Sequence, residues 1–265
     1  MLSLTSLSSE LLILIFEKGL PSSWEEGNRA DLYAKAIPCD LLVSLKLACP
    51  TPPLRTDLDT LKQLLLKSRY LETLHYQDRG QGTQFRFNAS ERLPSYRELI
   101  LRSYDWNHDK EDVAAHLDFS QIRSLELISV PIFNFLASIS PFDFAQLNNL
   151  HIEDFSAHTS PDRRVEATSG LYKLVRDNIR ALRTLRITCH IAFFAIDAIL
   201  THSKTLQNLQ LRDHVGFAEG DRRCPTLQIE DLMKLSRSLV VLETLELDLD
   251  VGPTVLPNFL SALCA

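Results

Sequence analysis

The adjacent residues Cys189 and His190 are the pair in this chain whose types best suit nucleophilic chemistry. An imidazole beside a thiol can take its proton and leave a reactive thiolate. The pair ends a segment that we expect to be a strand, and neighbouring side chains of a strand point to opposite faces. We therefore expect the thiol and the ring to lie apart and to form no catalytic dyad.

Other chemical motifs give no support for a catalytic, cofactor or metal site. The eight histidines are scattered singly, without an H-x-x-x-H pair, and the cysteines include no C-x-x-C, so a zinc site is not indicated. The chain has no G-x-x-x-x-G-K-[ST] and no G-x-S-x-G. Glu25 and Glu26 lie in charged, loop-like sequence without an apolar pocket. We predict no enzyme activity and no cofactor.

A repeated tripeptide, Asp-Arg-Arg, occurs at 162–164 and again at 221–223. Both copies fall in polar insertions, at about 156–166 and 213–225. Arginine forks suit carboxylates and phosphates, so Arg163, Arg164, Arg222 and Arg223 are candidates for an anion-binding loop rim. The alternative is that charged residues only keep these loops soluble.

A recurring pattern, L-x-x-L-x-L, identifies the elements that must position such residues. It occurs eight times with conservative replacements, at intervals of 24 to 36 residues. The copies start at Leu42, Leu71, Tyr96, Ile122, Leu147, Leu182, Leu206 and Leu242. A period of roughly 20 to 29 residues built on this motif is typical of leucine-rich repeats, in which each unit supplies one short strand. The two longest intervals contain the polar insertions.

Segments with helical spacing lie between the strand motifs. Their apolar stripes fall at 58–65, 171–182, 196–200 and 229–239, and a further stripe at 256–263 follows the last motif. Alternating strands and helices predict parallel strands joined by helical crossovers. A doubly wound sheet would show longer units and a Gly-rich first turn, which are absent. We predict an α/β solenoid of about eight irregular repeats, with strands on the concave face and helices on the convex face.

The strand alternation also predicts which side chains line the concave face, because the leucines of each motif face the core. The candidate partner-binding residues are Glu98, Glu126, His151, Glu153, Arg186, Gln210, Arg212 and Glu246. Glu98, Glu126 and Glu153 form an expected acidic patch, and Arg186 with Arg212 an expected basic one. Such a pattern would hold a partner of complementary charge in register. The alternative is that an exposed sheet is polar only for solubility.

Length, charge and cysteine content narrow the class of protein. The 265 residues fit one continuous array, and a net charge of −6 argues against general nucleic-acid binding. The apolar run 11–16 is too short to span a bilayer and lacks the features of a signal peptide. Five cysteines without paired spacing are typical of reduced thiols in a cytoplasmic or nuclear protein.

The segments 71–85 (LETLHYQDRGQGTQF) and 101–113 (LRSYDWNHDKEDV) resemble a group of fungal proteins labelled F-box or leucine-rich-repeat proteins. LSSELLILIF at 7–16 resembles the first half of an F-box, with Ser8 in place of the usual proline, and DLLVSLKLAC at 40–49 resembles the second half. The resemblance implies a substrate receptor of a cullin-type ubiquitin ligase. Its contacts with a Skp-type adaptor would be Leu7, Leu11, Leu12, Ile15 and Phe16.

A second interpretation of the N-terminus is a capping helix at 9–18 followed by a first repeat strand at 42–47, since an array needs an atypical end unit. We therefore divide the chain into a cap or degenerate F-box at 1–40 and a repeat array at 41–265. The leading hypothesis for the whole chain is a non-catalytic scaffold that binds a protein on its concave face. The ligase receptor remains the alternative.

Overall fold

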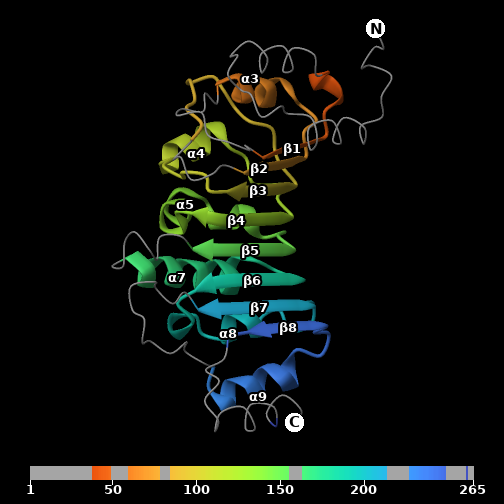
Figure 1. Ribbon diagram of the computed structural model, residues 1–265, viewed down its shortest axis with the longest axis vertical. Coiled ribbons are helices and arrows are strands. Elements are labelled where there is room, and N and C mark those ends of the chain that lie inside the picture. The colour runs from red at the N-terminus through yellow and green to blue at the C-terminus, as the bar shows by residue number, and fades with distance from the viewer. Residues whose placement is uncertain are drawn as a thin grey trace.

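The computed structural model describes residues 38–48, 59–77, 84–154, 163–213, 227–248 and 261. In these ranges the chain forms one sheet of eight parallel strands, which are stacked along the long axis of the molecule (Figure 1). The strands are β1 (Ser44–Ala48), β2 (Thr73–Gln77), β3 (Glu98–Arg102), β4 (Ser124–Val130), β5 (Asn149–Asp154), β6 (Thr184–Cys189), β7 (Asn208–Asp213) and β8 (Thr244–Leu247). Each strand begins two residues after the start of a sequence motif, which confirms all eight predicted strands.

The strand order follows the chain order from β1 to β8 without a reversal. Equivalent motif positions lie side by side, as in the pairs Leu45↔Leu74 and Leu211↔Leu247. One irregularity shifts the register between Ile128 and Val130 at the end of β4. A doubly wound sheet would contain a point where the order reverses, so the sequential order separates this fold from that alternative.

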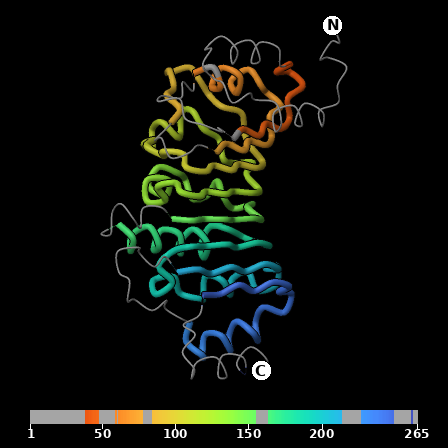
Figure 2. Tube along the Cα trace, in the orientation of Figure 1, coloured from red at the N-terminus to blue at the C-terminus, as the bar shows by residue number. Residues whose placement is uncertain are grey.

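Helices join the strands along the side of the sheet stack (Figures 1 and 2). The longer ones are α3 (Asp59–Lys67), α4 (Lys110–His116), α5 (Ile132–Ser138), α7 (Arg164–Lys173) and α9 (Ile229–Ser238). Shorter turns are η2 (Cys39–Leu41), η3 (Pro141–Phe144), η6 (Ile191–Phe193), α8 (Asp197–Leu200) and the π-helical turn η5 (Leu174–Asn178). Helix α9 matches its predicted range closely, and α8 falls within its own. Helix α3 overlaps its predicted stripe at 58–65 and extends two residues beyond it. The predicted stripe at 171–182 ends as a helix at Asn178.

Two of these helices were not expected from apolar periodicity. Helix α4 starts at a side-chain cap, because Asp109 Oδ1 accepts a hydrogen bond from the Asp112 backbone N–H at 2.7 Å. Such a cap satisfies one of the amide groups that the first helical turn leaves unpaired. Helix α5 follows Pro131 directly and spans only two turns, which is too short for a periodic stripe.

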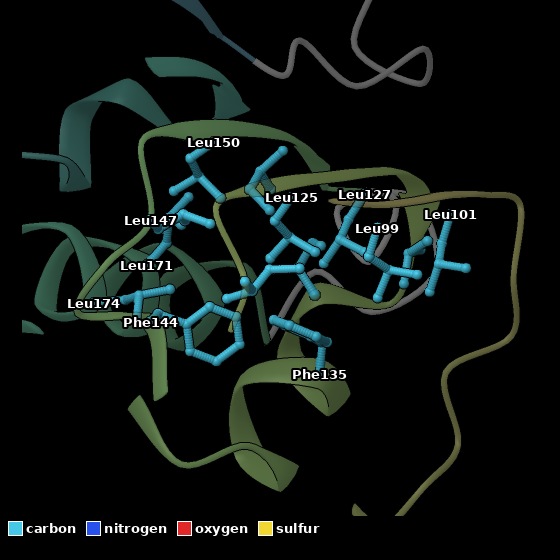
Figure 3. Close-up of a cluster of buried hydrophobic side chains, with 14 of the residues drawn as sticks. Leu99, Leu101, Leu125, Leu127, Phe135, Phe144, Leu147, Leu150, Leu171 and Leu174 are labelled. Carbon is cyan, nitrogen blue, oxygen red and sulfur yellow. The ribbon is translucent and has the colours of Figure 1, made fainter. Parts of the chain in front are cut away.

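The core lies between the inward side of the sheet and the helices. Its inner rows come from the motif leucines, and Figure 3 shows Leu125 and Leu127 facing Phe135 of α5. The predicted burial of these two leucines is confirmed, with exposed fractions of 1% and 0%. Leu174 and Phe144 fill the next layer from neighbouring crossovers.

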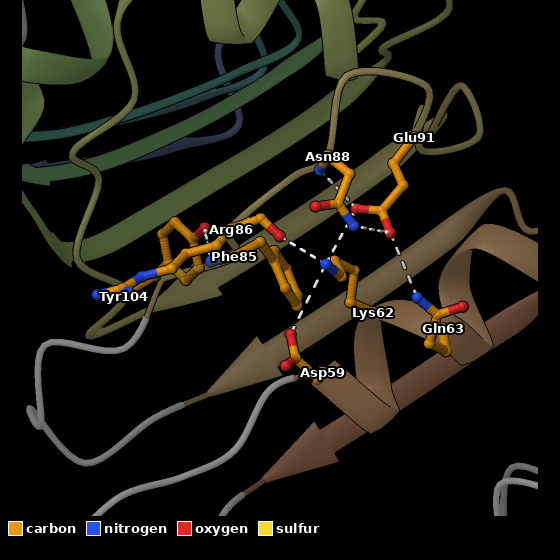
Figure 4. Close-up of polar contacts among 8 residues, drawn as sticks. All are labelled: Asp59, Lys62, Gln63, Phe85, Arg86, Asn88, Glu91 and Tyr104. Carbon is orange, nitrogen blue, oxygen red and sulfur yellow. Dashed lines mark hydrogen bonds and ion pairs between the residues drawn. The ribbon is translucent and has the colours of Figure 1, made fainter.

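The connection between β2 and β3 is extended where it is described, at residues 84–97, and contains no helix there. Lys62 of α3, only 5% exposed, anchors it. Its ammonium donates to the Arg86 carbonyl at 2.6 Å and pairs with Glu91 at 3.0 Å (Figure 4). The Phe85 backbone N–H donates to the Tyr104 hydroxyl at 2.8 Å. A segment without helical hydrogen bonds needs such partners.

In the described part of the chain, no helix combines the length and apolar character needed to cross a bilayer.

Candidate binding surface

The parallel register arranges the outward side chains into rows that cross the whole sheet. We call this side, which alternates with the buried leucines, the open face. Its first row is Ser44, Thr73, Glu98, Ser124, Asn149, Thr184, Asn208 and Thr244. Its middle row is Lys46, His75, Ile100, Glu126, His151, Arg186, Gln210 and Glu246. Its last row includes Gln77, Arg102, Ile128, Glu153, Thr188 and Arg212. All eight sequence-predicted partner-binding residues lie in these rows.

Glu126 lies at the centre of an ionic cluster on the open face. Its carboxylate accepts a hydrogen bond from Arg102 Nε at 2.7 Å and lies 3.0 Å from His151 Nδ1. The hydrogen bond with His151, then that with Arg102, lowers the pKa of Glu126 to about 2, although partial burial acts in the opposite direction. Only 17% of the Glu126 side chain is exposed. We expected an exposed residue, but its neighbours largely enclose this one.

Two further side-chain pairs lie on the same face. His75 Nε2 lies 2.9 Å from Glu98 Oε1, and Arg212 Nε donates to Glu246 Oε1 at 3.1 Å. The expected acidic and basic patches are therefore largely paired within the sheet itself. The sequence alone could not indicate these pairs, because the two residues of each pair lie 23 or 34 positions apart in the chain.

Glu153 and Arg186 remain unpaired on adjacent strands. Neither makes a hydrogen bond or an ion pair to another described residue. Arg186 is exposed and Glu153 half-buried. The register aligns Arg186 with His151 and Glu153 with Thr188, so the two charges are diagonal neighbours. They are the free charges nearest the middle of the open face.

Two apolar residues interrupt this otherwise polar face. Ile100 and Ile128 are half-buried and lie diagonally on β3 and β4. Arg102 and Glu126, which pair with each other, occupy the other diagonal. Sequence analysis did not select Ile128, although it is two residues beyond Glu126 and alternation alone would have found it.

The predicted loop rim is only partly within the described residues. The Arg163 guanidinium lies 4.2 Å from the centroid of the Phe133 ring, a cation–π contact that ties this arginine to α5. Arg164 is the first residue of α7. Arg222 and Arg223 lie outside the described residues, so the four-arginine rim stays a prediction.

The adaptor-contact residues Leu7, Leu11, Leu12, Ile15 and Phe16 also lie outside the described residues. Residues 44–48, within the segment 40–49 that resembles the second half of an F-box, form strand β1. This strand is the first repeat strand that the capping interpretation expects. Whether the N-terminal segment binds an adaptor stays a prediction.

Cys189 is the last residue of β6, and His190 lies just beyond the strand, at the start of η6. Cys189 ends β6 within the core at 2% exposure, and burial raises the pKa of its thiol well above the usual range. His190 follows the strand, half-buried, and burial lowers the pKa of its ring. The thiol is therefore held in its protonated, unreactive form. Cys39 and Cys189 are both free of disulfides.

Between β3 and the extended segment lies a small cavity of about 20 Å³. Its walls are almost wholly apolar, with Phe87, Leu93 and Trp106 among them, and it has room for one water molecule. Among the described residues, no group of three or more His, Cys, Asp or Glu side chains is arranged to hold a metal ion. The open face is thus the extended polar surface that remains as a candidate site.

Comparison with protein-family models, with curated proteins and with solved structures finds no match to this chain.

Proposed function

We propose that this chain is a non-catalytic scaffold that binds a protein partner through the open face, which we take to be the concave face of a leucine-rich-repeat solenoid. Two features support the repeat assignment. The L-x-x-L-x-L motif recurs eight times in the sequence, and every copy coincides with one strand of a sheet whose order follows the chain. In repeat arrays each unit packs on its neighbours, and the stacked strands present an extended binding surface.

The observation that carries the functional proposal is the continuity of the open-face rows. Outward side chains from eight strands, polar apart from Ile100 and Ile128, lie side by side across the sheet, while the core lies between its opposite side and the helices. Contacts spread over many strands suit a macromolecular partner better than a small molecule, which needs a concave pocket. We place the protein in the cytoplasm or nucleus, where five cysteines in an odd number stay reduced.

Site-specific photo-cross-linking tests this proposal. A benzophenone amino acid would replace Asn149, Thr188 or Gln210 on the open face, and Glu111, Lys173 or Arg237 on the helices as matched controls. After irradiation in native cell extract, the open-face positions are expected to give a discrete protein adduct that the helix positions do not give. Adducts that form equally from both sets, or only from the helices, would refute binding by the open face.

A further inference from the structure

We infer that the partner presents an extended segment with an apolar, a basic and an acidic residue at positions i, i+2 and i+4, lying across strands β3 to β6. The apolar residue contacts Ile100 and Ile128, the basic residue pairs with Glu153, and the acidic residue pairs with Arg186. This inference rests on the proposed function and specifies the chemistry of the partner.

The apolar contact follows from the arrangement around Ile100 and Ile128. On a sheet face exposed only to water, polar residues are expected at both positions. Arg102 and Glu126, which border the two isoleucines, already bond to each other, with His151 on the far side of Glu126. They therefore need no new polar partner when an apolar group covers the isoleucines. A small apolar centre with a self-satisfied polar surround is the common arrangement of an energetically important contact.

The charged contacts follow from Glu153 and Arg186, which make no hydrogen bond or ion pair to another described residue. The guanidinium of Arg186 is exposed and presents a fork that suits a carboxylate. Glu153 is half-buried and favours an ammonium or guanidinium. The other carboxylates of the open-face rows, Glu98, Glu126 and Glu246, already have histidine or arginine partners. Ion pairs with Glu153 and Arg186 thus fix the position of the partner's segment along the open face.

The spacing of the three contacts fixes the motif. Neighbouring strands lie about 4.8 Å apart. Measured across the strands, Glu153 on β5 is therefore about 7 Å from the centre of the isoleucine pair, and Arg186 on β6 about 12 Å. An extended peptide places residues i, i+2 and i+4 on one side at steps of about 6.7 Å. A helix needs eight residues to rise about 12 Å, and over those residues its side chains rotate by about 80° relative to the starting direction. The third side chain would then point away from the sheet. The extended form therefore fits all three contacts, in either chain direction.

Selection from a phage-displayed library of random 12-residue peptides tests the inference on the full 265-residue chain. The wild type is compared with the charge-exchanged variant E153K/R186E. A matched control, E111K/R183E, makes the same changes at exposed residues outside the open-face rows. Circular dichroism melts verify that all three proteins fold.

We expect the wild type and the control to enrich peptides with the apolar–x–basic–x–acidic pattern, read in either chain direction. The charge-exchanged variant should enrich apolar–x–acidic–x–basic, again in either direction. A synthetic peptide of the first pattern should bind the charge-exchanged variant about tenfold or more weakly, and exchanging the peptide's two charges should restore its affinity.

If both proteins enrich the same peptides, or the wild type enriches none, the inferred motif is wrong. Where peptides are enriched, the variant N149R/Q210R then separates the two claims. Loss of binding of the enriched peptides to this variant would leave the open face as the binding surface, whereas unchanged binding would overturn the proposed function as well.

Discussion

Replacing one leucine by alanine at two places in the same row of the sheet should reveal how the stack distributes stability. Leu127 on β4 and Leu247 on β8 occupy equivalent register positions in the row Tyr76, Leu101, Leu127, Ile152, Ile187, Leu211 and Leu247. Leu127 is 0% exposed between two neighbouring strands. Leu247 is half-buried and pairs with β7 on one side.

The expected loss of unfolding free energy differs between the two sites because Leu127 is fully buried between two strands and Leu247 is partly exposed at the last strand. Removing about three carbon groups from full burial at Leu127 costs about 2.4 kcal/mol in transfer free energy. A residual cavity of about 50 Å³ adds about 1.2 kcal/mol, because the strands on both sides restrict relaxation. The free energy of unfolding should therefore fall by about 3.5 kcal/mol for Leu127→Ala. For Leu247→Ala we expect about 1 kcal/mol, since much of the side chain already contacts water.

Urea denaturation followed by far-ultraviolet circular dichroism would measure both losses against the wild type. The two variants share the same chemistry, so their difference reports only the position in the stack. Equal losses, or a larger loss at Leu247, would show that the core is not continuous through the central strands and would refute this account of the packing.

Other predictions address single polar contacts. His202 is only 1% exposed, and both of its ring nitrogens have partners. Its Nε2 lies 2.9 Å from the Val175 carbonyl oxygen, and its Nδ1 accepts a hydrogen bond from the Leu182 N–H at 3.3 Å. His202→Ala should therefore lower the free energy of unfolding by about 2 kcal/mol in urea titrations. Burial lowers the pKa of His202 from its unfolded value of 6.5. The neutral ring therefore contributes stability above pH 6.5, and this contribution is lost as the pH falls below that value. The loss of stability on acidification should be smaller in the alanine variant. The lowered pKa of Glu126 contributes stability above about 4.5 that disappears as the pH falls towards 2, and Glu126→Gln, which should cost about 1 kcal/mol at pH 7, should flatten that part of the acid-unfolding curve. If residues 1–40 act as an F-box, a purified Skp-type adaptor should be retained by the full chain and not by one that starts at residue 41; equal retention, or none by either, would contradict the ligase alternative.

The strands and the inward or outward direction of their side chains could be predicted from the sequence because one motif encodes both. Leucines spaced as L-x-x-L-x-L fix the register, and a shift by one residue would have exposed Leu125 and Leu127. Helices with sustained stripes, such as α9, were predicted for the same reason. The extended segment at 84–97 was not, because it is held by Lys62 and Tyr104, which are distant in sequence.

The open face was predicted in outline but not in its electrostatics. Alternation identified Glu126, Arg186 and Glu246 as outward-facing, and it could not show which charges meet across neighbouring strands. Side-chain conformation decides that pairing, because Glu126 bonds diagonally to Arg102 on β3 and directly across to His151 on β5. What distinguishes Glu153 and Arg186 is their lack of a partner among the described residues, which only the three-dimensional arrangement reveals.

Carboxylate footprinting would test the central claim, that partners bind the open face, most directly. Carbodiimide labelling of the chain, with and without the partner that the cross-linker identifies, reports the accessibility of each carboxylate by mass spectrometry. We predict that labelling of Glu153 and Glu246 falls several-fold in the complex, while Glu111 on α4 and Glu230 on α9 label unchanged. Protection of Glu111 and Glu230 with undiminished labelling of Glu153 and Glu246 would place the partner on the helices and contradict the account.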